Sequence, residues 1–209
     1  MKVTEQTFSR LTGSYFLDIV EYLVPDLLES LGYKKELVFE TEESNSSSTP
    51  DIVIRYDDKP VVILDYKGPN CIFDDELAVC SAGTVDEARS KLGSLRLKKS
   101  RNRTKNYETL LAAMDITLDT VVLIQQGVKY SKVFKTPTVL FYDYDTLLAL
   151  EVPQDLHDRK PGVLLDATIW KETEKSTESS PVYSDNNHIA VLLYHVVRAV
   201  KRYEESLGN

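Results

Sequence analysis

Residues 49–67 read TPDIVIRYDDKPVVILDYK, and this stretch combines strong strand signals with charged ends. Apolar residues alternate on either side of the polar run 57–60, DDKP, which has the composition of a tight turn. The alternation predicts two antiparallel strands joined at that turn. Both faces of the second strand are mostly apolar, so we expect a central strand that is covered on both sides.

Three charged residues are expected at the open end of this hairpin. Asp65 and Lys67 share a face because alternate residues of a strand point the same way, and antiparallel pairing places Asp51 across from them. Two adjacent carboxylates repel unless a cation lies between them, and oxygen ligands suit Mg²⁺ or Mn²⁺. Such an ion polarises a phosphate, and a nearby lysine can orient water or offset charge. The pattern predicts metal-dependent phosphodiester cleavage; the alternative is an ordinary solvated hairpin end.

The order of Pro50-Asp51, a strand, a turn, a strand and Asp65-Tyr66-Lys67 resembles the core motif of the PD-(D/E)XK nuclease superfamily. Residues 21–33, EYLVPDLLESLGY, are similar to the first helix of these restriction-endonuclease-like proteins, which often carries a glutamate. The resemblance implies an α/β fold with a mixed central β-sheet flanked by helices. It also implies a divalent-metal-dependent nuclease acting on DNA or RNA, with Asp51, Asp65, Lys67 and Glu21 as its catalytic residues.

A third acidic metal ligand beside Asp51 and Asp65 can come from three places. Glu21 lies in the apolar segment 15–24, where a carboxylate needs a partner such as a metal. A continuous helix over residues 5–24 would instead put Glu5 on the apolar stripe and turn Glu21 away. Gly13 is expected to break that helix, which favours Glu21. Glu40, at the end of a strand expected over 35–41, is the weakest candidate.

Two subfamilies fit the motif. One is the cap-snatching endonuclease domain of segmented negative-strand RNA viruses, although many of its members carry a histidine before the motif and this chain has none there. The other is the restriction-type or effector-type nuclease, which the segment 21–33 resembles. DNA and RNA therefore both remain possible substrates. The superfamily also includes inactive members, so a non-catalytic nucleic-acid-binding or protein-interaction module is the alternative function.

The charge distribution favours a nucleic-acid partner. The chain has a net charge of −8, but residues 89–105 hold eight basic residues and no acid, which leaves 17 basic against 33 acidic residues elsewhere. Such a basic strip is typical of a surface that binds a phosphate backbone. The residues expected to contact nucleic acid are Lys98, Lys99, Arg101, Arg103 and Lys105.

Length and composition predict one nuclease-like domain over residues 1–209. Strands are expected over 120–125 (TVVLIQ) and 138–142, a polar loop over 171–187, and an amphipathic helix over about 189–207 that could contact a protein partner. No apolar run of about 18 residues is present, so no membrane association is expected. The first residues lack the apolar core of a signal peptide, which predicts an intracellular protein.

Overall fold

A computed structural model describes residues 5–41, 49–68, 71–73, 76–77, 87, 90, 119–143, 146–154, 165–171 and 188–208, without the side chains of residues 5–16 and 121. The chain divides into two compact units, Met1–Asn70 with Gly127–Asn209, and Cys71–Gln126. The first unit holds the β-sheet and most of the described residues.

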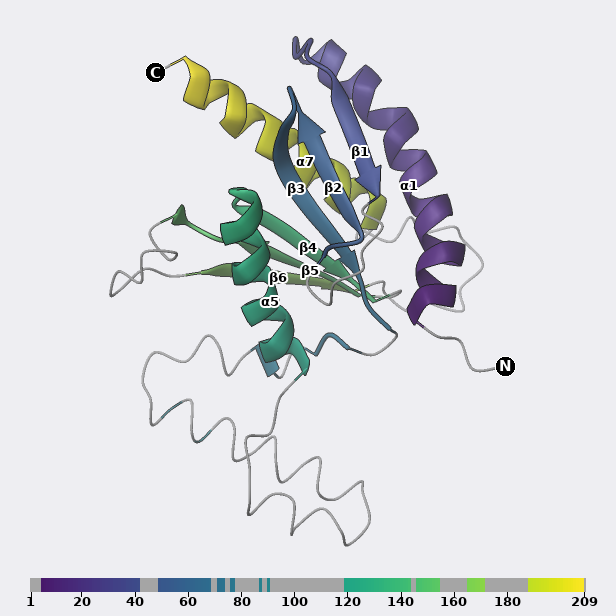
Figure 1. The fold of residues 1–209 in the computed structure, drawn as a ribbon, viewed down its shortest axis with the longest axis vertical. Helices are drawn as coiled ribbons and strands as arrows, with labels where there is room; N and C mark the ends of the chain where they lie inside the picture. Colours follow the sequence, from purple (N-terminus) through teal and green to yellow (C-terminus); the bar gives the residue numbers. More distant parts are fainter. Residues whose placement is uncertain are drawn as a thin grey trace, which may run out of the picture. The chain divides into compact units, whose positions relative to one another are not determined.

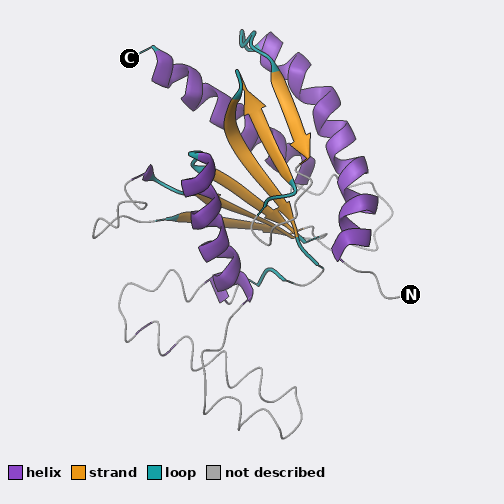
Figure 2. Ribbon diagram, viewed as in Figure 1, coloured by secondary structure: helices purple, strands orange, loops and turns teal. Residues whose placement is uncertain are grey.

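The protein is an α/β protein with a six-stranded mixed sheet (Figures 1 and 2). The described elements are three helices and six strands: α1 (Glu5–Ser30), β1 (Leu37–Thr41), β2 (Ile52–Tyr56), β3 (Lys59–Tyr66), α5 (Asp119–Phe134), β4 (Thr138–Tyr142), β5 (Thr146–Glu151), β6 (Asp166–Lys171) and α7 (His188–Leu207). The strands lie side by side in chain order. Only the β3–β4 pair is parallel, which requires a long crossover connection, and α5 lies in that connection.

Helices α1 and α7 cover one face of the sheet. Alternate residues of the central strands point to this side and join one core cluster with the buried faces of the two helices. That cluster includes Leu17, Val20, Val24, Leu28, Ile54, Leu64, Leu140, Leu147, Leu192, Val196 and Val200. Burying the apolar stripes of α1 and α7 in this way is the main force that holds both helices on the sheet.

The C-terminal half of α5 lies on the opposite face. The ring of Tyr130 stacks on the ring of Phe141, with 6.4 Å between the ring centroids. Gly127 allows this helix to come close, because a Cβ atom there would lie 2.4 Å from the Cδ1 of Leu150 and 3.1 Å from Phe141. The sheet is therefore covered on both sides at β4, as the apolar composition of the central strands requires.

The predicted hairpin is present as β2 and β3. Asp57 and Asp58 both have positive φ (55° and 59°), which is the geometry of a two-residue type I′ turn. The turn is shorter than the four residues expected, since β3 already begins at Lys59. Ile54 pairs with Val62 but Arg55 pairs with Pro60, so one extra residue on β3 forms a bulge. β3 is the third of six strands, which confirms its expected central position.

Two sequence-based predictions of local structure were wrong. Gly13 does not interrupt the first helix, because α1 runs continuously from Glu5 to Ser30 and includes Pro25. Gly32 terminates the helix just after Ser30, and its φ of +87° and its hydrogen bond to the carbonyl of Glu29 belong to a Schellman motif. The buried stripe Leu17, Val20, Val24 and Leu28 continues across Pro25, so packing on the sheet outweighs the N–H group that proline lacks.

The segment TVVLIQ, predicted as a strand, is the first part of α5. Its β-branched residues suggested a strand, but the buried positions Thr120, Leu123, Ile124 and Gly127 recur at helical spacing. The predicted strand at 138–142 and the predicted C-terminal helix are confirmed as β4 and α7. Residues 91–118, which hold most of the basic strip, and residues 172–187 of the polar loop lie outside the described residues.

The second unit is described around the beginning of α5. The buried carboxylate of Glu76 accepts a hydrogen bond from the backbone N–H of Thr120, at 2.8 Å. The hydroxyl of Thr120 in turn accepts a hydrogen bond from the N–H of Phe73, at 2.7 Å. A carboxylate at this place satisfies a free N–H group and complements the positive end of the helix dipole.

Helices long and apolar enough to cross a bilayer do not occur in the part of the chain that is described.

Candidate active site

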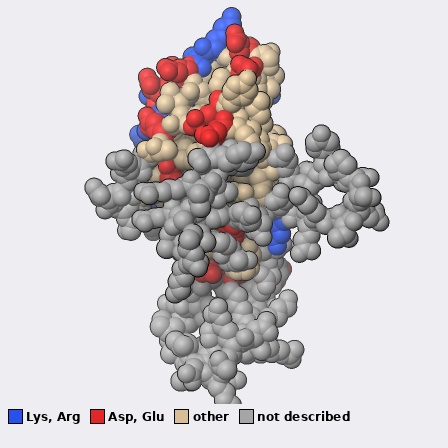
Figure 3. Space-filling model, turned by 90° about the vertical axis from the view of Figure 1, so that its right-hand side faces the viewer, with Lys and Arg blue, Asp and Glu red and all other residues tan. Residues whose placement is uncertain are grey.

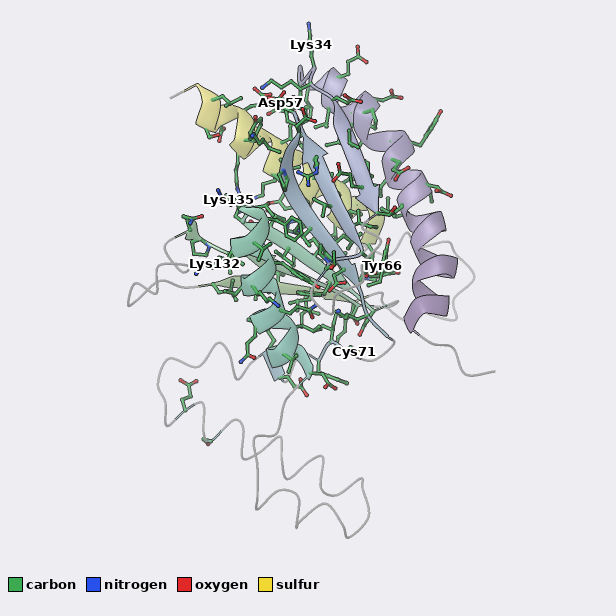
Figure 4. The ribbon with its side chains drawn as sticks, in the orientation of Figure 1. Lys34, Asp57, Tyr66, Cys71, Lys132 and Lys135 are labelled. Carbon is green, nitrogen blue, oxygen red and sulfur yellow. The ribbon has the colours of Figure 1, made fainter. Side chains whose placement is uncertain are left out.

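Asp51, Asp65 and Lys67 come together at the end of the β2–β3 hairpin that lies opposite its turn. The Oδ2 atom of Asp51 accepts a hydrogen bond from the backbone N–H of Tyr66, at 2.7 Å. The Nζ atom of Lys67 lies 2.8 Å from the Oδ2 atom of Asp65. Figure 4 labels Asp57 in the turn and Tyr66 at the other end of the hairpin, next to this cluster.

The two carboxyl groups form a coupled pair. Asp65 is only 3% exposed, and burial raises its pKa to about 7, against the lowering effect of Lys67 and with a further raising effect from a hydrogen bond to Asp51. A hydrogen bond between two carboxyl groups requires that one of them holds a proton. The Asp65 carboxyl therefore keeps its proton to a higher pH than an isolated aspartate does.

Lys67 is held by the neighbouring parallel strand. Its backbone N–H donates to the carbonyl oxygen of Tyr142, at 2.8 Å, which continues the β3–β4 pairing one residue beyond β3. Its Nζ atom lies 5.7 Å from the centroid of the Phe141 ring, a cation–π distance. The ammonium group is thus fixed between a carboxylate and an aromatic ring, with only 15% of the side chain exposed.

Glu21 lies on the solvent-exposed side of α1, the helix that covers the other face of the sheet. Partial burial and the nearby Asp18 raise the pKa of Glu21. Burial is the main cause that raises the pKa of the Tyr66 phenol. The nearby groups of Asp51, Tyr142 and Glu21 raise it further, in that order. Glu21 therefore lies near the same strand end as the aspartates but on the side of Tyr66 rather than of Asp65.

The other two candidates for a third acid differ in position. The carboxylate of Glu40, in β1, forms an ion pair with Arg55 of β2. The side chain of Glu5 lies outside the described residues, as do Lys98, Lys99, Arg101, Arg103 and Lys105. Among the described residues, no group of three or more His, Cys, Asp or Glu side chains is arranged to hold a metal ion.

Two residues at this strand end were not singled out in the sequence. Tyr66 has a buried hydroxyl that finds no hydrogen-bond partner among the described residues. Asp143 follows β4 at the edge where β3 also ends, is fully buried, and accepts a hydrogen bond from the N–H of Thr146, at 3.1 Å. An aspartate directly after a buried parallel strand could have indicated Asp143, whereas Tyr66 stands at the variable position of its motif and gave no signal.

The two histidines of α7 are packed inside the protein. The ring of His188 meets the ring of Tyr142 edge to face, with centroids 5.4 Å apart. His195 lies with its Nδ1 atom 3.3 Å from Glu151. The face of α7 that carries the two histidines and the apolar residues is therefore packed against the rest of the protein.

Comparisons of the chain with protein-family models, with curated proteins and with solved structures found no match.

Proposed function

We propose that this protein is a divalent-metal-dependent nuclease that hydrolyses phosphodiester bonds of DNA or RNA, with a restriction-endonuclease-like fold. The observation that carries the proposal is the cluster of Asp51, Asp65 and Lys67 at one end of the central hairpin. Two coupled carboxyl groups with a fixed ammonium group beside them form the smallest set of residues that this chemistry requires.

The donor atoms suit Mg²⁺ or Mn²⁺. Magnesium is held by one or two protein carboxylates and completes its shell with water and substrate phosphate oxygens, so Asp51 and Asp65 are sufficient ligands. Burial is the main cause of the raised pKa of Asp65, and a bound cation would offset this cost of keeping the carboxylate ionised. The continuous helix α1 removes the reason for preferring Glu21 to Glu5 as a third acid, so Asp51 and Asp65 alone carry the metal-binding proposal. When bound, the ion supplies Lewis-acid polarisation of the phosphate and a water of lowered pKa.

The residues of the chain have separate tasks in this proposal. Asp51 and Asp65 hold the cation, and the N–H of Tyr66 keeps the Asp51 carboxylate in position. Lys67 orients the attacking water or offsets the negative charge that develops on the phosphate. Asp65 and the Phe141 ring hold the ammonium group, and the Tyr142 carbonyl holds the Lys67 backbone, before substrate arrives, which lowers the cost of reaching the transition state.

The test is cleavage of labelled single-stranded RNA, single-stranded DNA and duplex DNA in the presence of Mn²⁺ or Mg²⁺. We expect the wild-type protein to cleave at least one of them. Asp65→Asn and Lys67→Met should each lower the rate by roughly 100-fold or more, as the loss of one transition-state contact does elsewhere. The matched control is Asp58→Asn in the exposed turn, which removes the same charge and keeps a residue that tolerates positive φ.

Metal binding is tested separately by thermal unfolding. At 100 times its Kd, a ligand of the folded state adds about 2.7 kcal/mol to the free energy of unfolding. Mn²⁺ should therefore raise the melting temperature of the wild type and of Asp58→Asn, but not of Asp51→Asn. A wild type that binds nucleic acid but cleaves none would be the inactive binding module, and one that does neither would favour a protein-interaction domain.

A further inference from the structure

Three exposed lysines lie in the C-terminal half of α5 and directly after it. Lys129, Lys132 and Lys135 are exposed, and none forms an ion pair with any residue that the structure describes; we call these three residues the α5 ridge. Most other described basic residues are neutralised: Lys35, Arg55, Lys67, Arg198, Lys201 and Arg202 all have carboxylate partners. Figure 4 labels Lys132 and Lys135 at this end of the helix.

The sequence around the ridge contains no compensating acid. No aspartate or glutamate occurs between Asp119 and Asp143, in a chain with 33 acidic residues. A favourable interaction with the helix dipole accounts for lysines in the last turn of a helix, where the effect is confined. It does not account for Lys129, which lies more than a turn before the helix ends at Phe134. The local positive charge therefore exceeds what helix stability requires.

The ridge and the candidate active site lie on the same face of the sheet. Tyr130, next to Lys129, stacks on the Phe141 ring, and the Nζ atom of Lys67 lies over the same ring. Thr136, next to Lys135, donates a hydrogen bond to the carbonyl of Val61, four residues before Asp65 in β3. A strand advances about 3.3 Å per residue, so this end of the ridge lies roughly 13 Å along the sheet from Asp65.

The opposite side has the opposite charge. Asp18, Glu21, Asp26 and Glu29 are exposed on α1, and acidic side chains gather on the described surface of that side in Figure 3. A polyanion is therefore repelled on the side of α1 and attracted on the side of α5. The ridge spans about 9 Å at 1.5 Å per residue, which matches two to three phosphates of one strand at about 3.4 Å each.

We propose that the α5 ridge binds the phosphate backbone of a nucleic acid and guides it across the sheet toward Asp65. This inference rests on the proposed nuclease function, because it supplies that function with a substrate surface. The contacts are to phosphates, so they add affinity and salt dependence without adding sequence preference.

The test compares two triple variants of equal net charge in the full chain. One variant is Lys129→Gln with Lys132→Gln and Lys135→Gln; the control is Lys34→Gln with Lys59→Gln and Lys201→Gln, three exposed lysines elsewhere. Affinity for duplex and single-stranded oligonucleotides is measured between about 50 and 200 mM salt. Three lost phosphate contacts should lower the magnitude of the slope of log K against log salt by roughly 2.1 for single strands and roughly 2.7 for duplexes, so that affinity should fall about 18- to 42-fold less than in the wild type over this range. The control should keep the wild-type slope.

The inference is overturned if the slope of log K against log salt falls equally in both variants, since net charge alone would then explain binding. It is also overturned if the slope falls in neither variant. It is also overturned if the ridge variant loses affinity for vesicles of anionic lipid and not for oligonucleotides. Wild-type cleavage is scored separately. If the ridge variant shows a smaller salt slope but the wild type cleaves nothing, phosphate binding by the ridge is supported and the nuclease function is rejected. If the wild type cleaves but the ridge variant keeps the wild-type slope, the nuclease function is supported and the ridge inference is rejected.

Discussion

Asp65 carries a carboxyl group at the end of a central strand, and burial makes ionisation of that group costly. A neutral carboxyl tolerates this place better than a carboxylate does, which is why the pKa of Asp65 rises to about 7. Lys67 and a shared proton offset part of the cost. A cation would offset more of it, so the strain of two adjacent acids and the capacity to bind a metal have the same origin.

The raised pKa predicts a pH dependence of stability. A group whose pKa is higher in the folded state stabilises that state below its ordinary pKa, and the contribution is lost as the pH rises toward the folded value. The free energy of unfolding of the metal-free protein should therefore fall between about pH 4 and about pH 7, by on the order of 2 kcal/mol from about pH 5 to about pH 8.

The measurement is urea unfolding at both pH values, without divalent cations. Asp65→Asn should show a much smaller difference between the two pH values than the wild type, whereas Asp58→Asn should keep the wild-type difference. An equal pH dependence in all three proteins would show that Asp65 titrates as an ordinary aspartate.

The packing of α5 against the sheet depends on one glycine. In Gly127→Ala, the new methyl group would meet the fully buried Leu150 and Phe141, and the helix would have to move outward. Overpacking of this kind costs about 1–3 kcal/mol, partly offset by the better helix propensity of alanine. We expect a lower melting temperature. Gly208→Ala is the control, since its nearest atom is 3.9 Å away, and an equal melting temperature for both variants would contradict the prediction.

Helix α7 is tied to the sheet by a half-buried carboxylate. Glu151 of β5 receives Arg202, His195 and Thr138 as hydrogen-bond partners. Burial acts to raise the pKa of Glu151, but the hydrogen bonds from His195 and Arg202 outweigh it, and the pKa is lowered. This contribution is present above the ordinary pKa of about 4.3 and is lost as the pH falls through the folded value.

Glu151→Gln should lower the free energy of unfolding by about 2–4 kcal/mol at neutral pH, because Arg202 would lose its charged partner. The difference from the wild type should shrink below about pH 4. Chemical unfolding across this pH range checks both statements, with Glu205→Gln as the control in an exposed pair. A cost that does not change with pH would point to packing rather than to charge.

The sequence predicted correctly those elements that depend on the pattern of residues within one short segment. The hairpin followed from alternation and turn residues, and α7 from its amphipathic period. The helical state of TVVLIQ was missed because it depends on a buried period that continues past Gln125 to Tyr130 and on a close approach at Gly127. The sequence placed Asp51, Asp65 and Lys67 at one strand end. It gave no sign that Phe141 and Tyr142 hold the lysine, because those contacts join residues far apart in the chain.

Among the described residues, exposed acids lie on α1 and exposed lysines lie on the α5 ridge. Exposed charges are screened beyond about 8–10 Å at physiological salt, so acids on the side of α1 should contribute little to nucleic-acid binding. The double variant Asp26→Asn with Glu29→Gln should change the affinity for duplex DNA by less than about two-fold at 0.15 M salt. Fluorescence anisotropy measures the affinity of this double variant for duplex DNA, with the α5 ridge variant measured in parallel. A gain as large as the loss in the ridge variant would show that nucleic acid passes over α1.

The parallel pairing of β3 with β4 also sets the order of folding steps while the chain is being synthesised. Asp51, Asp65 and Lys67 lie within one hairpin, whose closure costs little chain entropy, and they leave the ribosome together. Tyr142, which fixes the backbone of Lys67, follows 75 residues later. A nascent chain can thus pair its two acids early, but it cannot fix the lysine until β4 has been translated and has docked. An unfinished chain therefore has all three residues of the cluster but lacks the β4 contacts that hold Lys67.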